Sequence, residues 1–215
     1  MSILNVLLRP DQLLVAVDTL AEDAHTGRKS CGAKLLLIPQ HNLVLAARGS
    51  SQFFLRIYEL SLQASFRADF TMEQLSRELG LVIDQLWPGY ERAALEAGIQ
   101  PNALGSEMVL GGWSPRAGRI VATAYAKQSS ATPAVVLQLK GGLASPGEPL
   151  QGREDSFSPD AVLQSSRIQA AWLNKTTGRQ VAGGHVLAAV LREGQTVIHD
   201  LGSVSYTHLT LPTKA

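Results

Sequence analysis

The chain has 215 residues and a formal net charge of +1, with 45% apolar and 17% charged residues. Such a composition excludes a disordered protein, and the length fits one domain with a sizeable core. No basic block or basic stripe interleaved with aromatic residues argues for nucleic-acid binding. No apolar run approaches the roughly 20 residues of a membrane span, and we find no signal-peptide pattern at the N-terminus.

Cysteine and histidine usage points away from disulfide and metal chemistry. The lone Cys31 cannot form an internal disulfide and leaves no thiol zinc site, which favours a reducing compartment and a cytoplasmic location. The histidines stand at positions 25, 41, 185, 199 and 208, and none is spaced as a metal pair. We therefore expect each histidine to be a surface or core residue.

The first half of the chain reads as two hairpins followed by two helices. Apolar runs at 6–8, 13–17, 35–38 and 43–47 are separated by turn residues and predict four strands, buried on both faces. A helical stripe then starts near Ser50 or Ser51. The second helix starts at Thr71, which with Gln74 forms a capping box, and Pro88 is expected to interrupt it.

The second half returns to strands. Three runs are expected, at 107–110, 119–125 and 134–139. The Gly-, Pro- and Ser-rich stretch 141–157 predicts a loop. A helix should start at Ser158 and Pro159 and run to about Asn174, before a last pair of strands at 185–191 and 196–200.

This order of elements predicts an α+β protein. Strands that come in hairpin pairs cannot form a doubly wound parallel sheet. About nine strands, most of them buried on both faces, need two stacked and mainly antiparallel sheets with helices outside them. We expect a four-layer αββα sandwich spanning residues 1–202 as a single domain, with 203–215 as a non-native or disordered tail.

Three polar residues are evenly spaced near the N-terminus. Ser2 would become the first residue if Met1 is removed, Asp18 ends the run LLVAVD, and Lys34 begins the run KLLLI, sixteen positions further on. Each has an ordinary interpretation as a common second residue, a strand end or a solvated charge. Gly49 can likewise be a simple turn glycine.

Taken together, these features resemble the proteasome-type N-terminal nucleophile (Ntn) hydrolases, which include proteasome β subunits and the peptidase subunit of the bacterial proteasome-like protease. The segments LLVAVDTLA, LVLAARGSSQFFLRIYEL and VAGGHVLAAVLREGQTV resemble family segments in the same order, over about residues 2–201. The resemblance implies Ser2 as nucleophile with its own α-amine as base, Lys34 as electrostatic tuner, Asp18 as its partner, and Gly49 near the oxyanion-hole glycine.

The resemblance also implies properties beyond the site. It implies hydrolysis of peptide or other amide bonds, no metal and no organic cofactor. It further implies a peptide or polypeptide substrate and a homo-oligomeric ring, and it leaves an ATPase partner open. No nucleic acid or membrane is expected as a partner.

Several positions depart from the family pattern. The family usually has Thr where this chain has Ser2, and active β subunits carry an Asp and a Ser where Arg179 and Ala182 stand here. The family's Gly-Ser-Gly is matched only by Lys140-Gly141-Gly142, so Ser145 is a candidate replacement for its serine. One late helix of the family also has too little sequence to form. Two alternatives stay open: a catalytically silent structural subunit, and an amidase for small molecules.

Overall fold

The structure is a computed structural model that describes residues 2–23 and 26–204. Its helices are α1 (Ser51–Ala64), α2 (Met72–Glu96) and α3 (Pro159–Thr177). Its strands are β1 (Leu4–Arg9), β2 (Gln12–Asp18), β3 (Leu20–Glu22), β4 (Lys29–Cys31), β5 (Leu35–Ile38), β6 (Leu43–Gly49), β7 (Ser106–Ser114), β8 (Arg119–Lys127), β9 (Val135–Gln138), β10 (Leu143–Ser145), β11 (His185–Arg192) and β12 (Gln195–Ser203).

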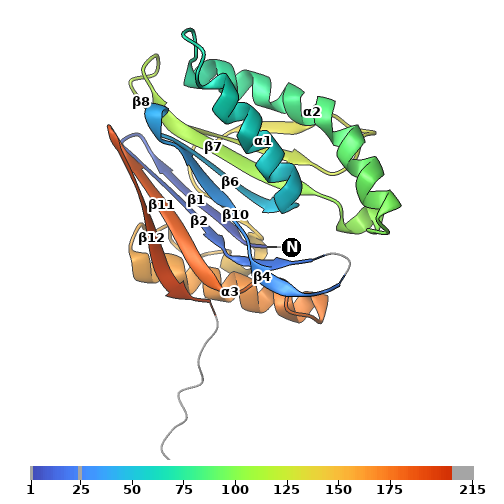
Figure 1. Cartoon of the computed structure of the whole chain (residues 1–215). Coiled ribbons are helices and arrows are strands. Elements are labelled where there is room, and N and C mark those ends of the chain that lie inside the picture. The colour runs from blue at the N-terminus through green and yellow to red at the C-terminus, as the bar shows by residue number, and fades with distance from the viewer. Residues whose placement is uncertain (1, 24–25, 205–215) are drawn as a thin grey trace, which may run out of the picture.

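The strands form two large antiparallel sheets and one small hairpin. One sheet has the order β10-β1-β2-β11-β12, the other has the order β5-β6-β7-β8-β9, and β3 pairs with β4 in a separate hairpin. The two large sheets face each other, with α1 and α2 covering one outer face and α3 the other (Figure 1). The predicted αββα sandwich of stacked antiparallel sheets is confirmed.

Three apolar clusters hold these four layers together. The first packs α1 and α2 on their sheet and contains Trp87, which is fully buried. The second lies between the sheets and is dominated by aliphatic residues of both, such as Val15 and Val109. The third packs α3, through residues such as Leu173, on the sheet that contains β1 and β2. The nearly continuous apolar runs of β2 and β6 are explained by burial on both faces.

The α2 helix differs from its predicted form because it continues through Pro88 to Glu96. A proline inside a helix removes one backbone hydrogen bond and normally bends or ends the helix. Here the residues on either side of it pack into an aromatic cluster. The rings of Trp87 and Tyr90 lie 5.0 Å apart, and Phe53 of α1 contacts both. This packing keeps the helix in place across the proline.

Three short strands were not predicted from the sequence. β4 is exposed, β3 is only partly buried, and both are three residues long without an apolar run, whereas β10 lies inside the stretch expected to be a loop. The helix caps were read more accurately. The Thr71 side chain accepts a hydrogen bond from the Gln74 amide (3.1 Å), and Ser50 caps α1 in the same way. At α3, Pro159 opens the helix, but Ser158 makes no side-chain cap bond.

The C-terminal boundary extends slightly beyond the expected position 202. Ser203 closes β12 and Val204 is buried, so both belong to the folded domain. The rest of the predicted tail, 205–215, lies outside the described residues. Across 2–23 and 26–204, none of the helices is long and apolar enough to cross a membrane.

Candidate active site

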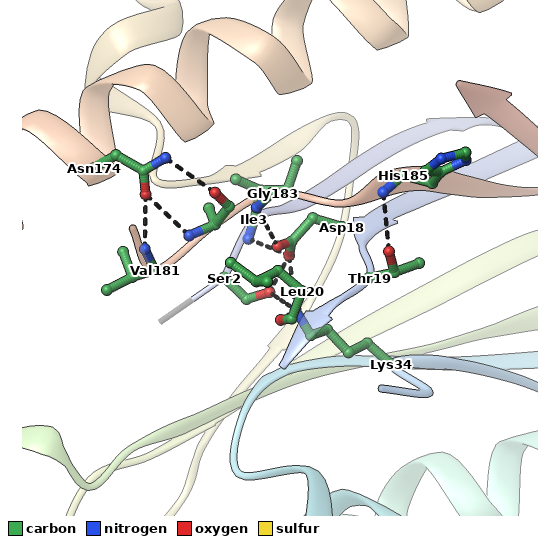
Figure 2. A network of polar contacts seen from close by, with 11 residues as sticks. Ser2, Ile3, Asp18, Thr19, Leu20, Lys34, Asn174, Val181, Gly183 and His185 are labelled. Atoms are coloured by element: carbon green, nitrogen blue, oxygen red, sulfur yellow. Dashed lines mark hydrogen bonds and ion pairs between the residues drawn. The ribbon is translucent and has the colours of Figure 1, made fainter. Parts of the chain in front are cut away.

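The structure brings Ser2, Asp18 and Lys34 together in one buried cluster (Figure 2). Their relative exposures are 2%, 0% and 6%. β1 and β2 are antiparallel neighbours, with Leu4 opposite Val17, so the residues just before β1 run beside the end of β2. Lys34 immediately precedes β5 of the other sheet. The cluster therefore lies where the two sheets meet.

Lys34 is fully engaged by its neighbours. Its Nζ atom donates to Ser2 Oγ (2.5 Å), to Asp18 Oδ1 (3.0 Å) and to the Leu20 carbonyl oxygen. A lysine ammonium carries three donors, and each has an acceptor here. This arrangement fixes the charge of Lys34 against the serine hydroxyl and leaves the side chain little freedom to move.

Asp18 is the hub of the cluster. Its Oδ1 atom accepts from the Ser2 hydroxyl and from the Ile3 amide (3.1 Å), in addition to Lys34. Its Oδ2 atom accepts from the Gly183 amide (2.9 Å) in the loop before β11. A buried carboxylate costs free energy unless it is paired and hydrogen-bonded, and here both oxygens are satisfied.

Burial lowers the pKa of Lys34 below the usual value for lysine, and attraction to the Asp18 carboxylate offsets part of this effect. Lys34 therefore releases its proton more readily than a solvated lysine does. It stands within hydrogen-bond distance of a serine hydroxyl. A lysine ammonium placed beside a serine hydroxyl can activate that hydroxyl electrostatically.

Gly49, the predicted oxyanion donor, stands apart from this hydrogen-bond network. It ends β6 with a φ of 110°, and its backbone packs closely against Gly105. Within 2–23 and 26–204, no hydrogen bond or ion pair joins Gly49 to the Ser2 cluster. Its packing gives a sufficient structural reason for the glycine, and its oxyanion role stays a prediction.

Substitution of Gly49 by alanine tests that structural role. A Cβ atom at position 49 would overlap the Gly105 carbonyl oxygen, and the φ of 110° strains any L-residue. Backbone strain at a positive φ should cost each variant about 1–3 kcal/mol of the free energy of unfolding. We expect Gly49→Ala to lose more than Gly98→Ala, because the overlap with Gly105 adds to the strain at position 49. Gly98 is a matched control, because it has a φ of 81° and open space around it. Equal losses in urea titrations would contradict this packing.

The positions that depart from the family pattern lie close to the cluster without joining it. Arg179 forms an exposed ion pair with Glu22 (2.6 Å), and Ala182 is buried. Ser145 pairs with Leu4 across β10 and β1, but its hydroxyl accepts from Arg48. Among the described residues, Ser145 makes no hydrogen bond to Ser2, so nothing here supports it as the replacement serine.

The sequence reasoning missed a third contribution to the site, the loop before β11. Gly183 is not among the residues predicted for the site, yet its amide donates to Asp18 Oδ2 and its carbonyl oxygen accepts from the Leu20 amide (3.1 Å). Asn174, in the last turn of α3, holds the same loop. A polar residue at the end of a helix whose final turn precedes the Gly-Gly was the available signal.

The part of the chain that the structure describes contains no candidate metal site. No group of three or more His, Cys, Asp or Glu side chains is arranged to hold a metal ion there. The cluster itself offers one carboxylate, one hydroxyl and one ammonium. These residues suit proton transfer and nucleophilic attack.

Comparison with known proteins supports the fold and goes no further. No protein-family model and no curated protein matches this chain. Among solved structures, it is similar to a Gly-1 mutant of Anbu from Hyphomicrobium sp. strain MC1, with a TM-score of 0.62 and 12% identity over 94% of this chain and 87% of that one. It is also similar to Anbu from Yersinia bercovieri, described as an ancestral beta-subunit, with a TM-score of 0.60 and 14% identity over 97% and 89%. The chain therefore has a proteasome-like fold, whereas identities this low show nothing of its activity.

Proposed function

We propose that the protein is a proteasome-like Ntn hydrolase that cleaves peptide or other amide bonds through Ser2 after removal of Met1. The observation that carries this proposal is the contact of the buried Ser2 hydroxyl with both Lys34 Nζ and the Asp18 carboxylate. A serine with a merely structural role does not require a lysine and an aspartate desolvated around it. Desolvating two charges costs several kcal/mol per ion unless their mutual attraction and their hydrogen bonds offset this cost.

The reaction follows from the groups present. Removal of Met1 would give Ser2 a free α-amine with a pKa of roughly 7.7–8.0, so a part of it is neutral near pH 7 and can accept the hydroxyl proton. The Ser2 oxygen then bonds to the substrate carbonyl carbon. The protonated amine next donates its proton to the leaving nitrogen, and the C–N bond breaks to leave an acyl-Ser2 ester.

Water completes the cycle. The neutral α-amine takes a proton from a water molecule, whose oxygen attacks the ester carbon, and the Ser2 oxygen leaves with that proton restored. Lys34 supplies a fixed positive charge beside the reacting oxygen, and Asp18 holds Lys34 in place. We propose the Gly49 region for the developing oxyanion, in keeping with the family resemblance.

Two alternatives to this proposal predict different experimental results. A structural subunit without activity would retain Met1 or fail to react at Ser2. An amidase for small molecules would share the chemistry but not need a closed chamber, whereas a ring assembly would favour polypeptide substrates. The homo-oligomeric ring, the ATPase partner and the cytoplasmic location are part of the same proposal and need their own tests.

Hydrolysis assays test the proposed activity. We expect the purified protein to cleave a short peptide amide or a small acyl amide, and Ser2→Ala to abolish the cleavage. The matched control is Ser129→Ala, in the segment after β8, which should keep wild-type rates. Equal rates in Ser2→Ala and the wild type would refute Ser2 as the nucleophile. The substrate preferred, read beside the mass of the assembly from light scattering, distinguishes peptidase from amidase.

A further inference from the structure

One side chain outside the cluster orders the loop that reaches Asp18. Asn174 lies in the last turn of α3, and its Oδ1 atom accepts from the backbone amides of Val181 (2.8 Å) and Ala182 (3.0 Å). Its Nδ2 atom donates to the Ala182 carbonyl oxygen (3.0 Å). Figure 2 shows this side chain facing the loop from the α3 side. All three bonds go to the peptide groups directly before Gly183.

The next amide in the chain contacts the site. Gly183 N–H donates to Asp18 Oδ2, and the Gly183 carbonyl accepts from Leu20 N–H. The carbonyl of Leu20 in turn accepts from Lys34. A continuous series of contacts therefore runs from Asn174 through the loop to both charged groups beside Ser2.

We propose that Asn174 is a positioning residue of this site. It holds the Gly183 amide against Asp18 and so fixes the carboxylate that orients Lys34 and Ser2. This inference rests on the proposed function. It also accounts for a departure from the family pattern, because Arg179 points to Glu22 and Ala182 is apolar, so neither supplies the site with a polar side chain. Here the order of the loop comes from the adjacent helix.

Three variants separate positioning from packing. Asn174→Leu keeps a similar volume and removes all three hydrogen bonds. Asn174→Asp keeps the acceptor for both amides but sets a carboxylate oxygen against the Ala182 carbonyl, so we expect partial rescue. Thr176→Val is the matched control, because it removes side-chain bonds of the same helix end that go only to Trp172 and Leu173.

Amide hydrogen exchange reads the loop and the cluster separately. In Asn174→Leu we expect the Gly183 amide to exchange about tenfold faster or more, and the Ile3 amide, which donates to the other oxygen of Asp18, to lose protection as well. A role confined to the loop would change Gly183 and leave Ile3 as in the wild type, which would overturn the proposal. Unchanged exchange at Gly183 would overturn it too.

The rate at which a hydroxyl-directed electrophile labels Ser2 gives the functional readout. We expect Asn174→Leu to slow labelling by about 10- to 100-fold, since small displacements at a reacting site cost this much, with Asn174→Asp in between and Thr176→Val unchanged. Wild-type labelling in Asn174→Leu would overturn the positioning role. A wild-type protein that never labels refutes the proposed function instead, and the Ile3 exchange then decides the positioning claim alone.

Discussion

Replacement of Asp18 by alanine is expected to lower the free energy of unfolding by about 3–5 kcal/mol. The carboxylate is fully buried and accepts hydrogen bonds from Ser2, Ile3, Lys34 and Gly183. Its removal leaves Lys34 as an unpaired buried cation, which is why the cost exceeds that of an ordinary hydrogen bond. Equilibrium unfolding in urea, followed by circular dichroism, measures the difference.

The pH dependence of this loss has a definite sign. Burial lowers the pKa of Lys34, and the Asp18 carboxylate raises it in part. Removal of Asp18 takes away this compensation, so the pKa of Lys34 should be lower still in Asp18→Ala. Above its folded pKa in Asp18→Ala, Lys34 is neutral in the native state but still binds a proton in the unfolded chain, so the stability of this variant rises with pH. The deficit relative to the wild type should therefore shrink as the pH rises through the window between the two lowered pKa values.

An exposed ion pair provides the control for Asp18→Ala. Glu22 pairs with Arg179, whose side chain is 57% exposed. Surface pairs of this kind contribute about 0–1 kcal/mol, so Glu22→Ala should have a small effect. If Asp18→Ala also costs less than about 1 kcal/mol, the buried cluster does not have the charge arrangement described here.

Substitution of Lys34 by glutamine is expected to slow the labelling of Ser2 by about 10²- to 10³-fold, the range typical of a lost electrostatic contact at a reacting centre. The Nζ atom lies 2.5 Å from Ser2 Oγ and is the only cation in the hydrogen-bonded cluster of described residues. Without it, the nucleophile loses its stabilising charge and Asp18 loses its counter-ion. The rate is measured by intact mass as a function of time at several pH values.

Lys29→Gln is the matched control for this change. Lys29 lies on β4, close in sequence to Lys34, but it is exposed and donates to Gln180 Oε1 (2.8 Å). Ser2 in the Lys29→Gln variant should be labelled at the wild-type rate. If Lys34→Gln and Lys29→Gln behave alike while both remain folded, the Lys34 ammonium does not activate Ser2.

The fold could be predicted from the sequence because its largest elements carry strong patterns. The buried strands β2 and β6 are near-continuous apolar runs, and the N-terminal capping residues Ser50 and Thr71 mark the starts of α1 and α2. Tertiary packing decided the rest. Pro88 stays inside α2 because aromatic packing on both sides of it outweighs a lost hydrogen bond. The short strands β3 and β4 could not be predicted because they lack an apolar run.

The candidate site was predictable only in part. Ser2, Asp18 and Lys34 were found from their spacing and from the family resemblance, and the structure brings the three together. The contribution of Gly183 comes from a backbone amide, which every residue except proline carries, so sequence alone cannot single it out. Asn174 is a polar residue at the end of the helix that precedes Gly183, which makes it a candidate from sequence, but its contacts with Val181 and Ala182 are seen only in the structure.

The most direct test of the central claim is the intact mass of the protein before and after incubation with a hydroxyl-directed peptide electrophile. We predict that Met1 is absent, that one adduct forms, and that the adduct disappears in Ser2→Ala. A protein that retains Met1, or whose N-terminal Ser2 stays unlabelled under conditions in which the fold is intact, would contradict the proposed activity and favour the alternative of a structural subunit.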